Sequence, residues 1–180
     1  MVLIAITGTP GVGKTAVCRI IGKKGYSVVY LGKVVKAHGE LVSGFDRSRG
    51  VAEVDVDAAN SYIKKKYRGL KPVFIDSHFS HLFDVKLCIV LRCSPEVLGR
   101  RLKRRKYPKA KLRENLEAEA LDVITIESVQ THGKDKVYEI DTTGRSASSV
   151  AGTVLQILKT GNSKYREGRI DWSEEVLGWY

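Results

Sequence analysis

Short apolar runs alternate along the chain with longer segments in which apolar residues recur at helical spacing. The apolar runs have the length of strands, and they cover residues 2–6, 27–31, 73–75, 86–92 and 137–141. The segments with helical spacing cover residues 14–24, 58–67, 112–131 and 146–159, and a further helix begins at Ser94-Pro95. This alternation predicts an α/β fold in which a five-stranded parallel sheet is covered by helices on both faces.

Capping and breaking residues indicate where several helices begin and end. Asp57 is expected to cap the helix at 58–67, and Ser94 is expected to cap the helix that begins with Pro95. Tyr107-Pro108 is expected to end that second helix. Residues 32–56 lack strong periodicity and are rich in glycine, so we expect a small mobile insertion there.

A glycine-rich loop joins the first strand to the first helix. It reads Gly8-Thr9-Pro10-Gly11-Val12-Gly13-Lys14-Thr15, which is the complete G-x-x-x-x-G-K-T pattern of a phosphate loop. Glycines let backbone N–H groups surround phosphate oxygens, while Lys14 can reach the β- and γ-phosphates and the Thr15 hydroxyl can complete the coordination of Mg²⁺. We therefore expect a nucleoside triphosphate and Mg²⁺ at this loop; the alternative is a glycine turn in an unrelated α/β domain.

A carboxylate stands at the end of the strand at 73–75, as in the second motif of nucleotide-binding proteins. Because the carboxyl ends of parallel strands meet at one sheet edge, Asp76 is expected beside Thr15, where it could hold Mg²⁺. His78 could enter the same cleft and orient or deprotonate a water, whereas His81 is less well placed. The alternatives are a strand-ending Asp that binds backbone N–H groups and a structural histidine.

Nine basic residues and no acidic one lie between Gly99 and Arg113. The interruption at Tyr107-Pro108 indicates a flap whose arginines could neutralise a triphosphate and exclude water as it closes. Arg101 and Arg105 are the residues expected to have catalytic reach. The alternatives are a solvated basic helix and a surface that faces RNA. After the last strand, Arg145 could stack on an adenine base, although an ordinary turn explains that segment nearly as well.

Composition narrows the class of protein. The chain has 180 residues, a net charge of +11 and a 43% hydrophobic content, which fits one globular domain. The charge exceeds what one nucleotide needs, so it indicates either a nucleic-acid partner or a solvated basic surface. No apolar run is long enough to span a membrane. Three cysteines without metal-ligand spacing indicate a reducing cytosol and no zinc site.

Four segments together resemble the adenylate kinase isoenzyme 6 family of archaea and of the eukaryotic nucleus. The resemblance runs from residue 1 to about 160. The segments are the phosphate loop in the form GTPGVGKT, Asp76-Ser77-His78 as an Asp-x-His motif, Arg101-Leu102-x-x-Arg105-x-Tyr107 as the start of a lid, and Glu114-Asn115-Leu116-Glu117-Ala118-Glu119 as the helix after the lid.

The resemblance implies a nucleoside monophosphate kinase fold. Residues 1–160 would form the domain, with a monophosphate-binding insertion near 30–53 and a lid near 103–113, and residues 161–180 would form an aromatic tail packed on the domain or a partner. It implies transfer of the terminal phosphate of Mg-ATP to AMP, together with ATPase activity. It also implies a role in maturing the small ribosomal subunit, through a platform ribosomal protein (universal small-subunit protein eleven) and ribosomal RNA, in the archaeal cytoplasm or the eukaryotic nucleus.

The resemblance also implies roles for individual residues. Lys14 would bind phosphate, Asp76 would bind Mg²⁺ with Thr15 or position water, His78 would serve ATP hydrolysis and Arg105 would serve lid closure. The residues implied to bind the nucleotide are Gly8, Gly11, Val12, Gly13, Lys14, Thr15, Ala16 and Arg105. The basic Arg47-Ser48-Arg49 and Lys33 stand where the family usually has acidic residues, which leaves the acceptor monophosphate open.

Two other functions fit the same residues. One is a ribosome-assembly ATPase in which kinase turnover is incidental. The other is a small-metabolite kinase, because such enzymes use the same phosphate loop.

Overall fold

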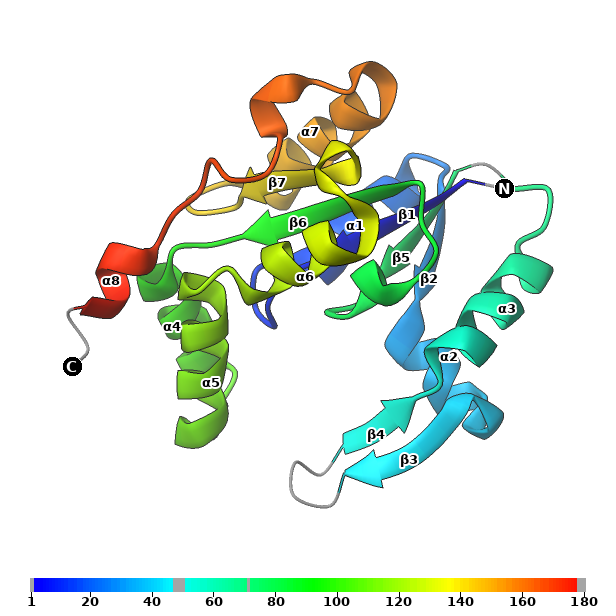
Figure 1. The fold of residues 1–180 in the computed structure, drawn as a ribbon, viewed down its shortest axis with the longest axis horizontal. Coiled ribbons are helices and arrows are strands. Elements are labelled where there is room, and N and C mark those ends of the chain that lie inside the picture. The colour runs from blue at the N-terminus through cyan, green and yellow to red at the C-terminus, as the bar shows by residue number, and fades with distance from the viewer. Residues whose placement is uncertain (1, 47–50, 71, 178–180) are drawn as a thin grey trace.

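A parallel sheet forms the centre of the protein. The computed structural model describes residues 2–46, 51–70 and 72–177. Its five-stranded sheet has the order β2-β5-β1-β6-β7, and every pairing within it is parallel (Figure 1). The strands are β1 (Leu3–Thr7), β2 (Ser27–Tyr30), β5 (Val73–Asp76), β6 (Leu87–Arg92) and β7 (Val137–Asp141).

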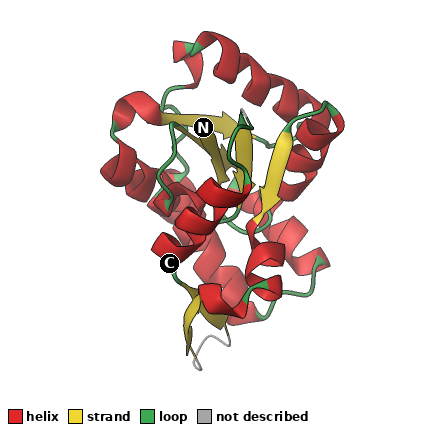
Figure 2. Ribbon diagram, turned by 90° about the vertical axis from the view of Figure 1, so that its right-hand side faces the viewer, coloured by secondary structure: helices red, strands yellow, loops and turns green. Residues whose placement is uncertain are grey.

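Helices cover both faces of this sheet, as Figure 2 shows. Alternate residues of β1 supply the two cores: Ile4 and Ile6 lie in one apolar cluster, and Leu3 and Ala5 lie in the other. The first cluster includes residues of α1 (Lys14–Lys23), α4 (Pro95–Arg104) and α7 (Ala147–Thr160), and the second is covered by α3 (Val56–Lys66) and α6 (Val123–His132). The expected fold class is therefore confirmed.

The insertion between β2 and α3 has more regular structure than the sequence indicated. It contains α2 (Leu31–Ala37), a short 3₁₀ turn, and an antiparallel hairpin of β3 (Val42–Asp46) and β4 (Val51–Val54). The strands of this hairpin contain Ser43, Gly44 and Glu53 and form no continuous apolar run, which explains why they were not expected. The hairpin extends away from the central sheet (Figure 1). Arg47, Ser48 and Arg49 lie outside the described residues.

Two helix boundaries differ from the expected ones. Asp55 caps α3, because its side chain accepts a hydrogen bond from the Ala58 backbone N–H at 2.9 Å, so the expected cap at Asp57 is wrong. The single helix expected at 112–131 is two helices, α5 (Lys109–Ala120) and α6. Asp122 adopts a left-handed conformation with φ of 57° between them, and its carboxylate accepts a hydrogen bond from Arg92, a long-range partner that no local pattern reveals.

Helix α4 ends in a defined backbone turn at its junction with α5. Tyr107 N–H binds the Leu102 carbonyl at 3.2 Å and Lys106 N–H binds the Lys103 carbonyl at 2.9 Å. Lys106 itself is left-handed, with φ of 58°. This is the Schellman arrangement, and Pro108 follows it directly, so the helix ends where Tyr107-Pro108 was expected to end it.

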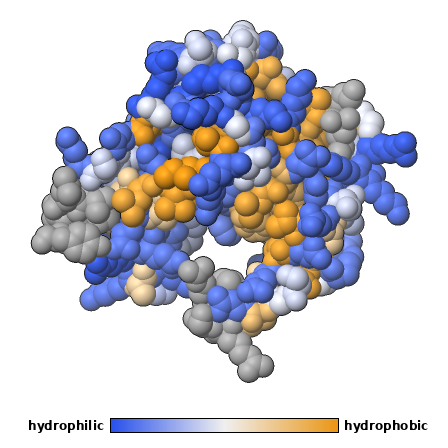
Figure 3. Space-filling model, in the orientation of Figure 1, coloured by the Kyte–Doolittle hydropathy of each residue, from blue (hydrophilic) through white to orange (hydrophobic). Residues whose placement is uncertain are grey.

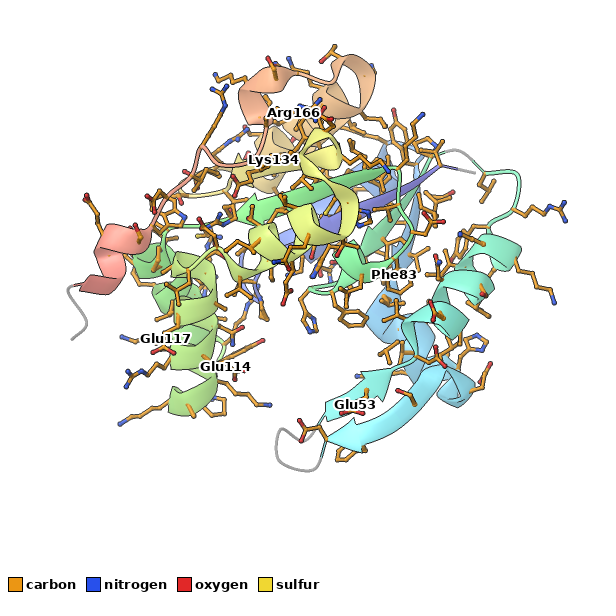
Figure 4. All side chains as sticks on the ribbon, viewed as in Figure 1. Glu53, Phe83, Glu114, Glu117, Lys134 and Arg166 are labelled. Carbon is orange, nitrogen blue, oxygen red and sulfur yellow. The ribbon has the colours of Figure 1, made fainter. Side chains whose placement is uncertain are left out.

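The segment after α7 runs back over the domain. Arg166 forms an isolated bridge with Tyr138 of β7 and its guanidinium lies 4.5 Å from the centre of the Tyr138 ring. Lys134 and Arg166 lie near each other at that edge of the sheet (Figure 4). Farther along, α8 (Ser173–Leu177) contacts α5. Trp179 and Tyr180 lie outside the described residues, and the domain boundaries proposed from the sequence stay predictions.

Two expectations from composition concern the described part of the chain. Cys18, Cys88 and Cys93 are buried and form no disulfide. Within the described residues, none of the helices combines the length and the apolar character that crossing a membrane requires.

Candidate active site

The phosphate loop leaves the carboxyl end of β1 and leads into α1. Gly8, Gly11 and Gly13 have φ of 126°, 102° and 115°, a region that residues with side chains avoid. At Gly13 the space that a Cβ would occupy is open, so nothing in the protein blocks the approach of a ligand there. This loop geometry fits a phosphate chain held by backbone N–H groups at the start of a helix.

Gly8 is needed for a different reason. A Cβ on this residue would stand 2.2 Å from the Leu91 carbonyl oxygen of β6, which no neighbouring movement of a side chain could relieve. The loop therefore lies directly against the end of the central sheet. Only glycine allows this close approach.

Lys14 lies folded against the loop that carries it. Its Nζ donates to the carbonyls of Gly8 and Thr9 at 2.5 and 3.0 Å, and the residue is only 9% exposed. Burial lowers its pKa to about 8, against an opposing effect of the Asp76 carboxylate. The ammonium group is therefore held in a poorly solvated place, where a phosphate anion is a strong electrostatic partner.

Thr15 and Asp76 meet as the sequence predicted. The Thr15 hydroxyl donates to Asp76 Oδ2 at 2.7 Å, and burial raises the pKa of the Asp76 carboxyl. One carboxylate and one hydroxyl provide hard oxygen donors, which suit Mg²⁺ when waters and phosphate oxygens complete its shell. Among the described residues no three His, Cys, Asp or Glu side chains form a metal cluster, so this pair fits a nucleotide-bound magnesium rather than a self-contained metal centre.

His78 and His81 face different surroundings. His78 has an exposed edge and lines the cleft that also contains Lys14 and Asp76. Desolvation by the protein around the rest of its ring, and secondly the charge of Lys14, lower its pKa. His81 is buried; its Nδ1 lies 2.9 Å from the Thr7 hydroxyl and its Nε2 lies 3.1 Å from Glu127. The structure thus brings His78 to the cleft and leaves His81 in the interior.

A pocket lies beside the phosphate loop. It has a volume of about 190 Å³ and is lined by residues of the loop and of α1 together with Arg101, Arg105 and Arg145. Arg145 donates to Thr153 Oγ1 at 2.8 Å and to Ser149 Oγ at 3.0 Å, so its guanidinium is fixed in the pocket wall.

Arg101 is anchored to the loop rather than extended over it. Its guanidinium donates to the carbonyls of Val12 and Thr142, each at 3.3 Å. The Thr142 hydroxyl also lies 2.9 Å from the Val12 carbonyl. Arg101 therefore supports the wall of the phosphate loop and lines the pocket beside it, and its expected catalytic reach stays a prediction.

A second cleft opens on the other side of the loop. It has a volume of about 520 Å³ and is lined by Tyr30 and Lys33 near the insertion, by Asp76 and His78, and by Arg105 and Tyr107 at the junction between α4 and α5. Figure 3 shows this region hollowed between the domain and the arm that carries the hairpin. Arg105 is exposed and lines both this cleft and the pocket beside the loop.

Glu119 and Thr142 contact the loop but were not identified from sequence. Glu119 accepts the hydroxyl hydrogen of Thr9 at 2.5 Å from the end of α5, and Thr142 follows β7. Both contacts join residues more than a hundred positions apart. The only local signal was the glutamate-rich segment that ends at Glu119.

Comparisons with known proteins identify the family to which the chain is related. Residues 4–122 match the family model described as an AAA domain. A protein of Methanothermobacter thermautotrophicus named "Putative adenylate kinase" is 45% identical over 98% of this chain and 100% of its own length. Proteins with the same name from Pyrococcus furiosus and Pyrococcus abyssi are 41% and 40% identical, covering 97% and 96% of this chain and 95% and 92% of their own lengths.

The chain belongs to this archaeal adenylate kinase-like family. Solved structures place the family member among P-loop kinase folds. A shikimate kinase from Acinetobacter baumannii has a TM-score of 0.61 at 16% identity, covering 91% of this chain and 96% of its own. A deoxyadenosine kinase from M. mycoides has a TM-score of 0.55 at 17% identity, covering 88% and 99%. At these identities the likeness concerns the fold alone.

The lowered pKa of Lys14 makes the stability of this adenylate kinase-like protein depend on pH. Unfolded lysine titrates near 10.4, so between about pH 8 and pH 10 the unfolded chain binds more protons than the folded one, and the free energy of unfolding must rise with pH. Across this range we expect the free energy of unfolding of the wild type to rise by up to about 3 kcal/mol relative to that of Lys14→Met. Urea denaturation at several pH values measures the difference.

The exposed Lys23 at the end of α1 supplies the control for this measurement. Lys23→Met removes an exposed lysine from the same helix and is measured in parallel. A difference between wild type and Lys14→Met that does not change with pH would show that the folded chain does not depress the Lys14 pKa.

Proposed function

We propose that this protein is an adenylate kinase that transfers the terminal phosphate of Mg-ATP to AMP and also hydrolyses ATP. The observation that carries the proposal is the position of Arg105, whose side chain lines both the pocket beside the phosphate loop and the second cleft. A cation shared by the pocket at the phosphate loop and the neighbouring cleft is suited to a phosphoryl group in transit. The family relationship supports the same assignment.

The residues of the site fit such a transfer. An oxygen of the acceptor phosphate forms a bond to the γ-phosphorus, and the bond from that phosphorus to the β,γ-bridging oxygen breaks, giving two diphosphates from ATP and AMP. Lys14 moves from the Gly8 and Thr9 carbonyls to the phosphates, and Arg105 balances charge on the transferred group. Thr15 and Asp76 would hold Mg²⁺, which when bound neutralises charge on the β- and γ-phosphates.

The second cleft is the proposed acceptor site. Tyr30 and Lys33 line it at the base of the insertion, where a base could stack and a phosphate could find a cation. The insertion extends from this edge as a separate arm, so its hairpin can approach a bound acceptor without disturbing the sheet (Figure 1). A small-metabolite kinase would use the same phosphate loop, and the choice of acceptor distinguishes it.

His78 is the proposed residue for hydrolysis. It lines the acceptor cleft beside Asp76, and its lowered pKa keeps the imidazole neutral near pH 7. A neutral ring nitrogen can accept a hydrogen bond from a water and orient it toward the γ-phosphate. Hydrolysis would then occur when water occupies the place of the acceptor phosphate.

The kinase assignment predicts formation of ADP from ATP and AMP in the presence of Mg²⁺. Lys14→Met should lower this rate by about a hundredfold or more, because the charge that meets the phosphates is lost. Lys23→Met is the matched control and should keep the wild-type rate. A panel of acceptors completes the experiment. The proposal would be contradicted if no monophosphate yielded ADP while a hydroxyl-bearing metabolite was phosphorylated.

The role of His78 predicts a selective defect. His78→Ala should lower ATP hydrolysis by about tenfold to a hundredfold and change kinase turnover less than about threefold, since only hydrolysis needs a positioned water. Both rates are measured on the same preparation. His38→Ala, which changes a histidine that contacts Tyr62 outside the cleft, serves as the control. Equal loss of both activities would refute this role.

We further propose that the protein acts in the cytoplasm in maturation of the small ribosomal subunit, binding a platform ribosomal protein and ribosomal RNA. The net charge of +11 and the exposed cations Arg104, Lys106 and Lys109 at the lid junction support a polyanionic partner.

This proposal predicts salt-sensitive co-sedimentation with purified small ribosomal subunits. Changing Arg104, Lys106 and Lys109 to glutamate should abolish it, because phosphate contacts dominate such binding. Changing the three lysines of α3 (Lys64, Lys65 and Lys66) to glutamate gives a control of equal charge. Binding that is absent, or that both variants weaken equally, would count against a lid-mediated partner.

A further inference from the structure

A buried ionic cluster lies behind the phosphate loop, outside both clefts. Arg92, the last residue of β6, is 2% exposed and forms ion pairs with Glu119 at 2.8 Å, with Glu139 at 2.5 Å and with Asp122. Burial alone would lower the pKa of Arg92, but these carboxylates, Glu119 first, raise it above its ordinary value. The guanidinium therefore stays charged and fixes the carboxylates around it.

Glu119 divides its two oxygens between this cluster and the loop. Oε1 accepts from Arg92 Nε at 2.8 Å and from the Cys93 N–H at 3.0 Å. Oε2 accepts from the Thr9 hydroxyl at 2.5 Å. The last distance is typical of a charge-assisted O–H···O⁻ bond, and Thr9 and Glu119 are 1% and 2% exposed, so water does not compete for it.

Thr9 is held from two sides. Its carbonyl accepts from Lys14 Nζ on the side of the phosphate site, and its hydroxyl donates to Glu119 on the opposite, buried side. Because the side chain is buried, it is not available to a nucleotide in the cleft. Any effect of the hydroxyl on catalysis must therefore pass through the backbone that contacts Lys14.

Glu119 also belongs to the helix that follows the basic lid junction. It occupies the last turn of α5, the end that is buried against the domain, whereas the other end of α5 begins directly after Pro108. Glu114 and Glu117, labelled in Figure 4, lie closer to the start of the same helix. One carboxylate therefore joins the phosphate loop to the fixed end of the lid helix.

We propose that Glu119 is a positioning residue that holds the phosphate loop and the base of α5 together through the Thr9 hydroxyl. The ionic cluster around Arg92 fixes Glu119, Glu119 fixes the Thr9 peptide, and the peptide sets the starting position of Lys14. The loop is thus organised before ATP arrives. This inference rests on the proposed use of ATP at the loop, and the acceptor site does not enter into it.

The test is a pair of substitutions at Thr9. Thr9→Val keeps the shape and removes the donor, so we expect the KM for ATP to rise about tenfold, while the KM for AMP changes less than twofold. Thr9→Ser keeps the donor and should restore the KM for ATP to within about twofold of wild type. Ser128→Ala removes a buried hydroxyl that donates to the Ile124 carbonyl within α6, and it should change neither KM.

The outcomes separate positioning from mere support of the fold. A Thr9→Val protein with a lower melting temperature but an unchanged KM for ATP would overturn the proposal, as would a Thr9→Ser protein as defective as Thr9→Val. If Thr9→Val does not fold, Glu119→Gln replaces it with the same expected rise, and a wild-type KM for ATP would then overturn the proposal.

A binding measurement keeps this inference distinct from the proposed function. Titration with a fluorescent ATP analogue should show a Kd about tenfold higher for Thr9→Val than for wild type, whether or not AMP is an acceptor. Absence of ADP formation in the wild type would refute the kinase assignment alone. Equal Kd values for wild type and Thr9→Val would refute the role of Glu119 alone.

Discussion

The parallel pairing of β1 with both β5 and β6 is the constraint on which the site depends. Its register sets Ile6 opposite Asp76 on one side and Thr7 opposite Val90 on the other. Asp76 consequently ends its strand beside the loop that follows β1, within reach of Thr15, and the Leu91 carbonyl lies beneath Gly8. A shift of one residue in the pairing of β1 with β5 would turn the side chain of Asp76 to the opposite face, and a shift in the pairing of β1 with β6 would move the Leu91 carbonyl away from Gly8.

Buried polar groups also fix how the elements around the site are oriented, which apolar packing alone cannot do. Replacing a buried ion pair with apolar residues often leaves stability unchanged or improves it, so the cluster around Arg92 is poorly explained as a source of stability. It does have directional bonds, and these join β6, β7, α5 and the turn before α6 at fixed angles. Gly168 N–H also binds Glu139 at 2.7 Å, which brings the C-terminal segment into the same set of contacts.

The sequence was sufficient for whatever depends on local pattern. Five apolar runs predicted the five strands, and the G-x-x-x-x-G-K-T pattern predicted a glycine-rich loop between the first strand and the first helix. The meeting of parallel strand ends at one sheet edge predicted the contact between Thr15 and Asp76. The sequence was insufficient where contacts between residues far apart in the chain determine the local structure. Asp122 interrupts the helix expected at 112–131 and binds Arg92, and Glu119 binds Thr9 across 110 positions of the sequence. The hairpin of the insertion was missed because Ser43, Gly44 and Glu53 interrupt its strands, which therefore form no continuous apolar run like those of the central sheet.

The Schellman turn between α4 and α5 brings Arg104, Arg105 and Lys106 into succession as exposed cations at the C-terminal end of α4. Like charges so close together repel one another, and the helix dipole offsets only part of that repulsion. Bringing this corner toward the phosphate loop, where Lys14 adds another cation, is electrostatically uphill until a polyanion supplies the opposite charge. The junction between α4 and α5 would therefore approach the phosphate loop most readily when an anion lies between them, and under the proposed function the triphosphate would be that anion.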